Sequence, residues 1–205
     1  MSSDADGTNT FTPSGLIPEL PNAERKLETM ARLTASVRLY VVVSPDVPIE
    51  ISVERAKNVL EAAGIEIVVM EESLLEDVPE TLRVPRVGNC SGELTHDQQR
   101  LFGLNDRKSN RDVAVYFVRA TIPFVDGCAV HPDEHPGCII ASRATEWTLA
   151  HELGHVLGVA VHTDEPGRLM VSSTRQLGPP PPLPTLSSDE VSTMRRSMHV
   201  QPAVQ

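Results

Sequence analysis

The first strongly patterned stretch of the chain alternates between strand and helix periodicity. Residues 36–44, SVRLYVVVS, form a β-branched run followed by two prolines, which is typical of a buried strand. Residues 49–64 place apolar side chains at helical spacing and end at Gly64, a common helix stop. Residues 65–72, IEIVVMEE, then predict a second strand. This succession indicates a βαβ unit with parallel strands.

The rest of the chain continues the mixture of strands and helices. Between residues 73 and 111 the pattern is irregular, with one helix expected at 94–104. Further strands are predicted at 112–120 and 137–142, with an edge strand at 125–130 between them.

Two later helices are predicted. The clearest spans residues 145–158, with Ser142 or Thr145 as its N-cap and Gly158 as its stop. The C-terminal helix, in 186–200, has Ser187 or Ser188 as its cap. We therefore expect one α/β domain over residues 36–205, with a twisted mixed sheet, after a partly disordered extension at residues 1–35.

Composition narrows the possible partners. A net charge of -10 and a pI near 5.1 argue against nucleic acid or a membrane surface as the main partner, because both require clustered cationic side chains. No secretory signal or membrane span is visible. We expect a monomer that is cytoplasmic as synthesised, with export by a route without a signal as the alternative.

The three cysteines cannot all pair within one molecule. Cys128 and Cys138 flank HPDEHPG and could meet if that segment turns back on itself. In a cytosol, however, separate reduced thiols are expected for these two and for Cys90.

The candidate chemistry lies in residues 151–155, which read HELGH. Residues four apart lie on one face of a helix, so His151 and His155 can bind one zinc ion. Glu152, beside the first ligand, is placed to act as general base toward a zinc-activated water. The five-residue pattern also occurs by chance. The helix around it is otherwise apolar, however, and burying these polar groups without a metal would be costly.

A third ligand must come from beyond this helix. His162 is the first candidate, because Gly158 can break the helix and allow the chain to return toward the metal. Asp164 is the second candidate, although a turn residue before Pro166 and Gly167 is the commoner role for it. His131 and His135 resemble a second metal cluster, but a solvated loop is the favoured interpretation.

These motifs resemble those of the metzincin clan of zinc peptidases, and of the matrixins in particular. The clan's signature is HExxHxxGxxH followed by a methionine turn, whereas residues 151–162 read HELGHVLGVAVH, with one extra residue before the last histidine. The resemblance implies zinc at His151, His155 and His162, and an apolar floor at Met170. It also implies an edge strand near 123–131 that binds the substrate backbone, and a specificity pocket shaped by 171–178.

The function predicted is therefore a zinc-dependent metalloendopeptidase that hydrolyses protein or peptide substrates, with Glu152 as general base. The alternative is an inactive relative or interaction protein that binds zinc in a closed site, because the extra residue before His162 has spoiled the open coordination position.

Overall fold

The computed structural model describes residues 31–88, 90, 93–104, 111–130, 136–179 and 182–203. The N-terminal extension up to residue 30 and the histidines at 131 and 135 lie outside these residues. Within the described ranges, no helix has both the length and the apolar character needed to cross a membrane.

The predicted βαβ unit is present. β1 (Leu33–Val41), α2 (Ile49–Glu61) and β2 (Ile65–Leu74) follow one another, and the two strands pair in parallel. Gly64 has a φ of 67°, a conformation that favours glycine, directly before β2 begins. The strands and helix therefore follow the expected order, although β1 begins at Leu33 rather than at residue 36.

The remaining strands complete a mixed sheet in the order β2-β1-β3-β5-β4. β3 (Val113–Val118) pairs in parallel with both β1 and β5 (Gly137–Ala141). β4 (Gly127–Val130) pairs antiparallel with β5 and forms the edge of the sheet. A two-residue strand, β6 (Gln201–Pro202), pairs with the start of β1. The twisted mixed sheet expected from the sequence is confirmed.

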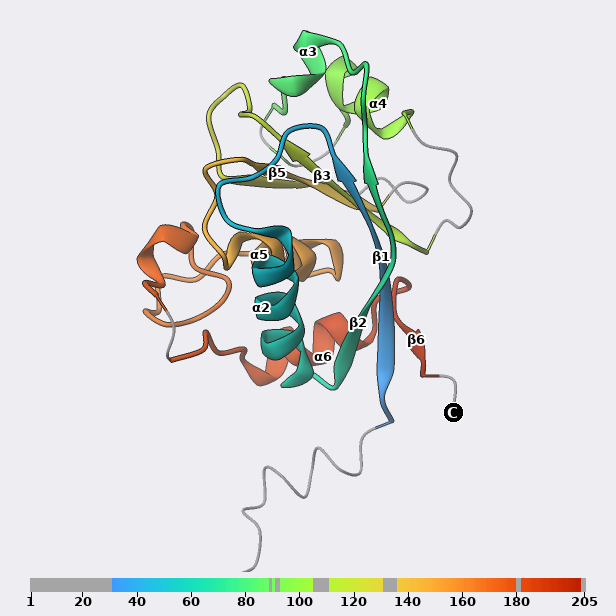
Figure 1. Cartoon of the computed structure of the whole chain (residues 1–205). Helices are drawn as coiled ribbons and strands as arrows, with labels where there is room; N and C mark the ends of the chain where they lie inside the picture. The colour runs from blue at the N-terminus through green and yellow to red at the C-terminus, as the bar shows by residue number, and fades with distance from the viewer. Residues whose placement is uncertain are drawn as a thin grey trace, which may run out of the picture.

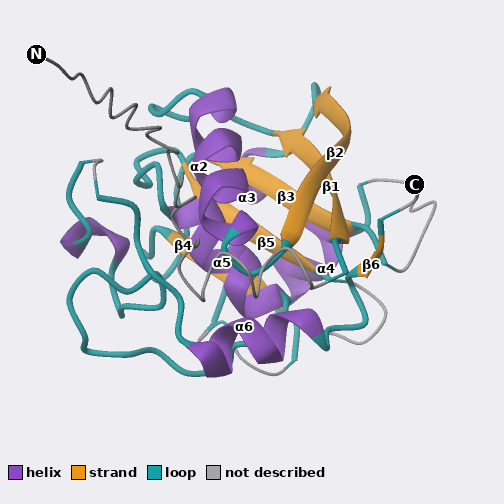
Figure 2. Ribbon diagram, turned by 90° about the horizontal axis from the view of Figure 1, so that it is seen from below, coloured by secondary structure: helices purple, strands orange, loops and turns teal. Residues whose placement is uncertain are grey.

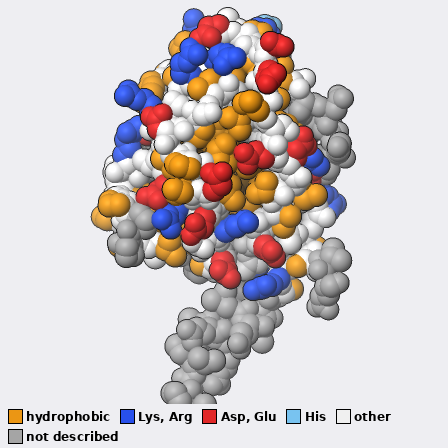
Figure 3. Space-filling view, viewed as in Figure 1, with side chains coloured by type: hydrophobic (Ala, Val, Ile, Leu, Met, Phe, Trp, Pro, Cys, Tyr) orange, Lys and Arg blue, Asp and Glu red, His pale blue; other side chains and the backbone are white. Residues whose placement is uncertain are grey.

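Helices cover both faces of the sheet (Figure 1). α2, α5 (Thr148–Val156) and α6 (Ser188–Arg195) lie on one face, as Figure 2 also shows, and bury most of the aliphatic core. α3 (Glu80–Arg83) and α4 (His96–Phe102) lie on the other face, over a smaller core that contains Tyr40, Tyr116 and Phe102. On the surface seen in Figure 3, cationic and anionic side chains are interspersed.

Helix boundaries show where local signals suffice. α6 begins as predicted, with Ser187 as N-cap and Glu190 completing a capping box. α5, in contrast, begins only at Thr148, and its N-cap is Trp147 rather than Ser142 or Thr145. The hydroxyl of Thr148 accepts from the backbone N–H of Thr145, so the residues before the helix form a turn instead of a capped end. α3 and a 3-10 helix at Thr174–Gln176 have no counterpart among the predicted elements.

The cysteine pairing differs from the sequence expectation. Cys90 and Cys128 form a disulfide with a Cα–Cα distance of 5.3 Å, and Cys138 is a buried free thiol. Cys128 and Cys138 cannot be partners because they face opposite sides of the sheet. Cys128 packs in the smaller core with Ile139, and Cys138 packs in the larger one.

Candidate metal centre

Helix α5 is buried almost throughout, and this burial fixes the orientation of its polar residues. Leu149, Ala150 and Leu153 pack in the core, while His151 and Glu152 are each only 5% exposed. Gly154 provides room on the same helix, because a Cβ there would lie 2.7 Å from the sulfur of Met170. The side chain of Met170 therefore packs against the helix at Gly154, and is itself fully buried.

The helix ends where the sequence predicted. Gly158 has a φ of 105°, and the backbone N–H groups of Gly158 and Val159 donate to the carbonyls of His155 and Gly154 at 2.9 and 3.1 Å. These bonds close the end of the helix and redirect the chain. The backbone N–H of Thr163 then donates to the carbonyl of Met170 at 2.8 Å, which holds the returning segment beside the methionine.

Gly158→Ala is expected to weaken zinc binding by about tenfold, because a left-handed conformation costs an alanine ~1–2 kcal/mol and this turn positions His162. The matched control is Gly167→Ala. Gly167 has a φ of 77°, and a Cβ there would meet no atom within 4 Å, so this variant carries the backbone penalty outside the turn. Titration of both variants with a chromogenic zinc chelator distinguishes them. Equal losses of zinc affinity would contradict the role of the Gly158 turn.

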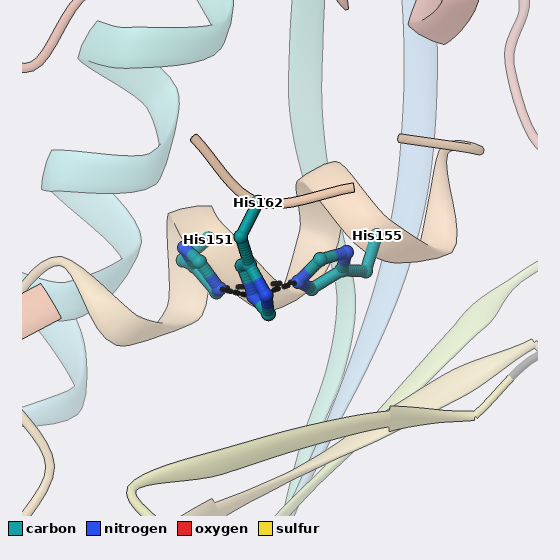
Figure 4. A group of neighbouring side chains, drawn as sticks. All are labelled: His151, His155 and His162. Carbon is teal, nitrogen blue, oxygen red and sulfur yellow. Dashed lines mark hydrogen bonds between the residues drawn. The ribbon is translucent and has the colours of Figure 1, made fainter. Parts of the chain in front are cut away.

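Three imidazoles converge on one point (Figure 4). His151 and His155 project from α5, and His162 comes from the segment beyond Gly158. The Nε2 atoms are 3.1 Å apart for His151 and His155, 3.2 Å for His151 and His162, and 3.0 Å for His155 and His162. Among the described residues, these three form the one group of histidine, cysteine or acidic side chains with metal-binding geometry.

Hydrogen bonds on the far side of two rings determine their tautomers. Nδ1 of His151 lies 2.8 Å from the carbonyl of Leu169, and Nδ1 of His155 lies 2.6 Å from the carbonyl of Val159. A carbonyl oxygen only accepts, so each neutral ring carries its proton on Nδ1 and directs the Nε2 lone pair toward the other histidines. Burial also lowers the pKa of His151, which favours the neutral ring.

This arrangement fits a zinc ion. Two lone pairs facing each other at 3.1 Å repel unless a cation or a shared proton lies between them. With Zn–N bonds of about 2.0–2.1 Å, tetrahedral ligand atoms lie roughly 3.3 Å apart, close to the three distances observed. Carbonyl partners on Nδ1 are also typical of histidines that bind a metal. The donor set therefore suits zinc.

Glu152 lies in the same cleft as the three histidines, which has a volume of about 600 Å³. Its carboxylate accepts the backbone N–H of Ala129 in β4. Gly127 of the same strand lies against the carboxylate, since a Cβ there would come within 2.7 Å of Cγ and Cδ of Glu152. Burial is the larger influence and raises the pKa of Glu152 to about 8, which the Ala129 hydrogen bond partly opposes.

In the metal-free protein, Glu152 is expected to make folding less stable as pH rises. Between pH 4.5 and about 8 the folded protein retains a proton on Glu152 that the unfolded chain has lost, so the free energy of unfolding falls with pH. The lowered pKa of His151 acts in the opposite direction, but only below pH 6.5. Above pH 6.5, the free energy of unfolding of the wild type should therefore fall by up to about 1.4 kcal/mol per pH unit relative to that of Glu152→Gln.

Urea denaturation of the chelator-treated proteins between pH 6.5 and 8 measures this difference. The same pH dependence in both proteins would show that the Glu152 carboxylate does not titrate differently in the folded state.

The segment after Met170 forms another wall of the cleft. Ser172, Ser173 and Thr174 line it, and the hydroxyl of Thr174 contacts that of Thr148 at 2.9 Å. Arg175 joins this segment to the residue before β4 through two hydrogen bonds to Asp126, at 2.7 and 2.5 Å. The structure thus brings the predicted edge strand and the predicted pocket segment into the cleft that contains the histidines.

Not every candidate joins the site. Asp164 is exposed and is not a member of the histidine group. Conversely, sequence reasoning missed Gly127, Ala129 and the carbonyls of Leu169 and Val159. A glycine inside a strand is a signal of close backbone approach and could have indicated Gly127. The other contacts are made by backbone groups, which no residue type reveals.

The comparisons with known proteins concern the fold. No family model matches the chain, and no curated protein matches it in sequence. Among solved structures, the chain is similar to archaemetzincin from Methanopyrus kandleri, with a TM-score of 0.53 and 14% identity over 80% of this chain and 94% of that one. Archaemetzincin from Archaeoglobus fulgidus, solved with malonate, matches at 14% identity over 77% of this chain and 99% of that one, with a TM-score of 0.44.

The first comparison shows that the chain has the fold of the archaemetzincin from Methanopyrus kandleri. The histidine group described above lies within this fold.

Proposed function

We propose that this protein is a zinc-dependent endopeptidase. The observation that carries the proposal is the convergence of three Nε2 atoms, 3.0–3.2 Å apart, in a cleft that also contains a buried carboxylate. His151, His155 and His162 would hold the metal. The archaemetzincin fold supports the same class of chemistry.

Zinc held by these histidines would supply Lewis-acid activation of a substrate carbonyl and of a water molecule. Glu152 takes the proton from the attacking water and delivers it to the leaving amine. The amide of Ala129 orients the carboxylate for this transfer. The carbonyls of Leu169 and Val159 hold the His151 and His155 rings in the tautomer that a metal requires.

The edge strand β4 is the proposed binding surface for the substrate backbone. The carbonyl of Asp126 accepts from Ala141 of β5, so alternation along an antiparallel pair directs the backbone groups of Gly127 and Ala129 away from β5. An extended peptide could therefore add to β4 along the cleft.

Metal content and hydrolysis together test the proposal. The purified protein should contain one zinc per chain and should cleave an unfolded protein substrate. A chelator should abolish the cleavage, and added zinc should restore it. Stoichiometric zinc without cleavage of any substrate in a broad peptide library would instead support the alternative, a zinc-binding interaction protein. Absence of any bound metal would refute both.

We further propose that the protein acts in an oxidising compartment rather than in the cytosol. The Cys90–Cys128 disulfide supports this, because such bonds persist mainly outside reducing compartments. Alkylation of intact cells, before lysis, should leave these two cysteines unmodified. Modification of Cys90 and Cys128 in the cells would favour the cytosolic location instead.

A further inference from the structure

Strand β4 contacts Glu152 through two residues on either side of Cys128, namely Gly127 and Ala129. A Cβ on Gly127 would lie 2.7 Å from Cγ and Cδ of the glutamate, and the backbone N–H of Ala129 donates to its carboxylate. Both contacts come from β4, which has only four residues and pairs on one side, with β5. The position of the carboxylate therefore depends on the position of this short edge strand.

The residue between these two faces the other side of the sheet. Cys128 is 1% exposed and packs in the smaller core with Tyr116 and Ile139. Its sulfur is bonded to Cys90, which lies in the segment between α3 and α4. The strand is thus tethered covalently on one face at the point where its other face meets Glu152.

The metal ligands do not depend on β4 in this way. His151 and His155 come from α5, and the carbonyls that orient them belong to Leu169 and Val159. His162 follows the Gly158 turn. A small displacement of β4 would consequently move the support of Glu152 and leave the histidine group in place. Displacement of a catalytic group by about 1 Å is sufficient to lower turnover by about 10²-fold.

We propose that the Cys90–Cys128 disulfide is a positioning device for Glu152. This inference rests on the proposed peptidase function. The disulfide holds β4 in one position. In that position the Ala129 amide donates to the Glu152 carboxylate, and Gly127 leaves space for the Glu152 side chain. When the bond is absent, the protein folds and binds zinc, but the carboxylate is no longer held in one position.

The test is a double-mutant cycle between the disulfide and Gly127. Cys90→Ser with Cys128→Ser removes the bond without leaving a thiol in the cleft, and Gly127→Ala intrudes on the carboxylate directly. Each change should lower kcat by about 10- to 100-fold with zinc content unchanged. Because both act through the same contact, the combined variant should lose less than the product of the two separate factors.

A matched control separates positioning from stability. Ile67 is buried in β2, at the opposite edge of the sheet, so Ile67→Ala should lower the Tm without lowering kcat below the Tm. If the double serine variant retains kcat within about twofold of the wild type, or loses it only in proportion to the unfolded fraction, the disulfide is structural and the inference is wrong.

Hydrogen exchange provides a readout that needs no activity. The amide of Ala129 should exchange slowly in the wild type and faster in both the double serine variant and Glu152→Ala, whereas Ile67→Ala should leave its local protection unchanged. Slow exchange of this amide in the double serine variant would overturn the inference. Failure of the wild type to cleave any substrate would refute the peptidase proposal, while the exchange result would still decide whether the disulfide positions Glu152.

Discussion

Glu152→Ala is expected to retain stoichiometric zinc and to lose peptide hydrolysis, with kcat lower by about 10²–10⁴-fold, the usual contribution of general acid–base catalysis. The reason is that Glu152 lines the cleft with the three histidines but is not a member of the metal-binding group. The other carboxylate in this cleft, that of Asp126, is paired with Arg175. Zinc content by atomic absorption and turnover of an unfolded protein substrate, measured on the same preparation, give the two required values.

Two further variants make the Glu152 result specific. Glu152→Gln preserves the volume of the side chain and an oxygen that can accept from Ala129, so it tests the proton-transfer role separately from packing. The side chain of Glu165 is 74% exposed. Glu165→Ala therefore removes a solvent-exposed carboxylate and should leave turnover unchanged. Substantial proteolysis by Glu152→Ala would show that another group is the general base.

His162→Ala is expected to weaken zinc binding by at least about 100-fold, because loss of an outer partner of a ligand already costs roughly 10- to 100-fold. Turnover should disappear with the metal at low zinc concentration. The physical reason is the position of the His162 Nε2 atom, which lies 3.2 Å from Nε2 of His151 and 3.0 Å from Nε2 of His155. This is the position of a third ligand to the same metal ion.

Asp164→Ala is the matched control, since Asp164 was the other candidate for the third ligand. It is exposed and outside the histidine group, so its removal should leave zinc affinity unchanged. Competition with a chromogenic chelator measures both variants. Loss of zinc from Asp164→Ala, with retention by His162→Ala, would mean that the loop rearranges when the metal binds and that aspartate is the third ligand.

Local periodicity was sufficient for the elements that carry the site. Apolar spacing predicted α2, β1, β2 and α5, and the Ser187 capping box marked the start of α6. The spacing of His151 and His155 implied a shared face of one helix, and Gly158 implied the turn after it. The structure confirms both placements, because these features depend on residues within a few positions of one another.

Other details required the whole fold. The start of α5 shifted to Thr148 because residues 145–147 form a turn stabilised by the Thr148 hydroxyl, which competes with the expected cap. The disulfide partner of Cys128 was Cys90, at a sequence separation of 38, rather than the nearer Cys138. Alternation along β4 and β5 places those nearer cysteines on opposite faces of the sheet.

The sequence by itself therefore predicted that His151, Glu152 and His155 lie on one helix. It also predicted the order of the strands and helices around that helix. Only the tertiary structure placed the His162 ring against the other two, the carbonyl of Leu169 behind His151, and Gly127 and Ala129 against Glu152. Helical spacing is a local property that four or five residues express. The contacts of β4 with α5 depend on how segments more distant in the chain pair and pack, and on backbone groups that every residue carries alike.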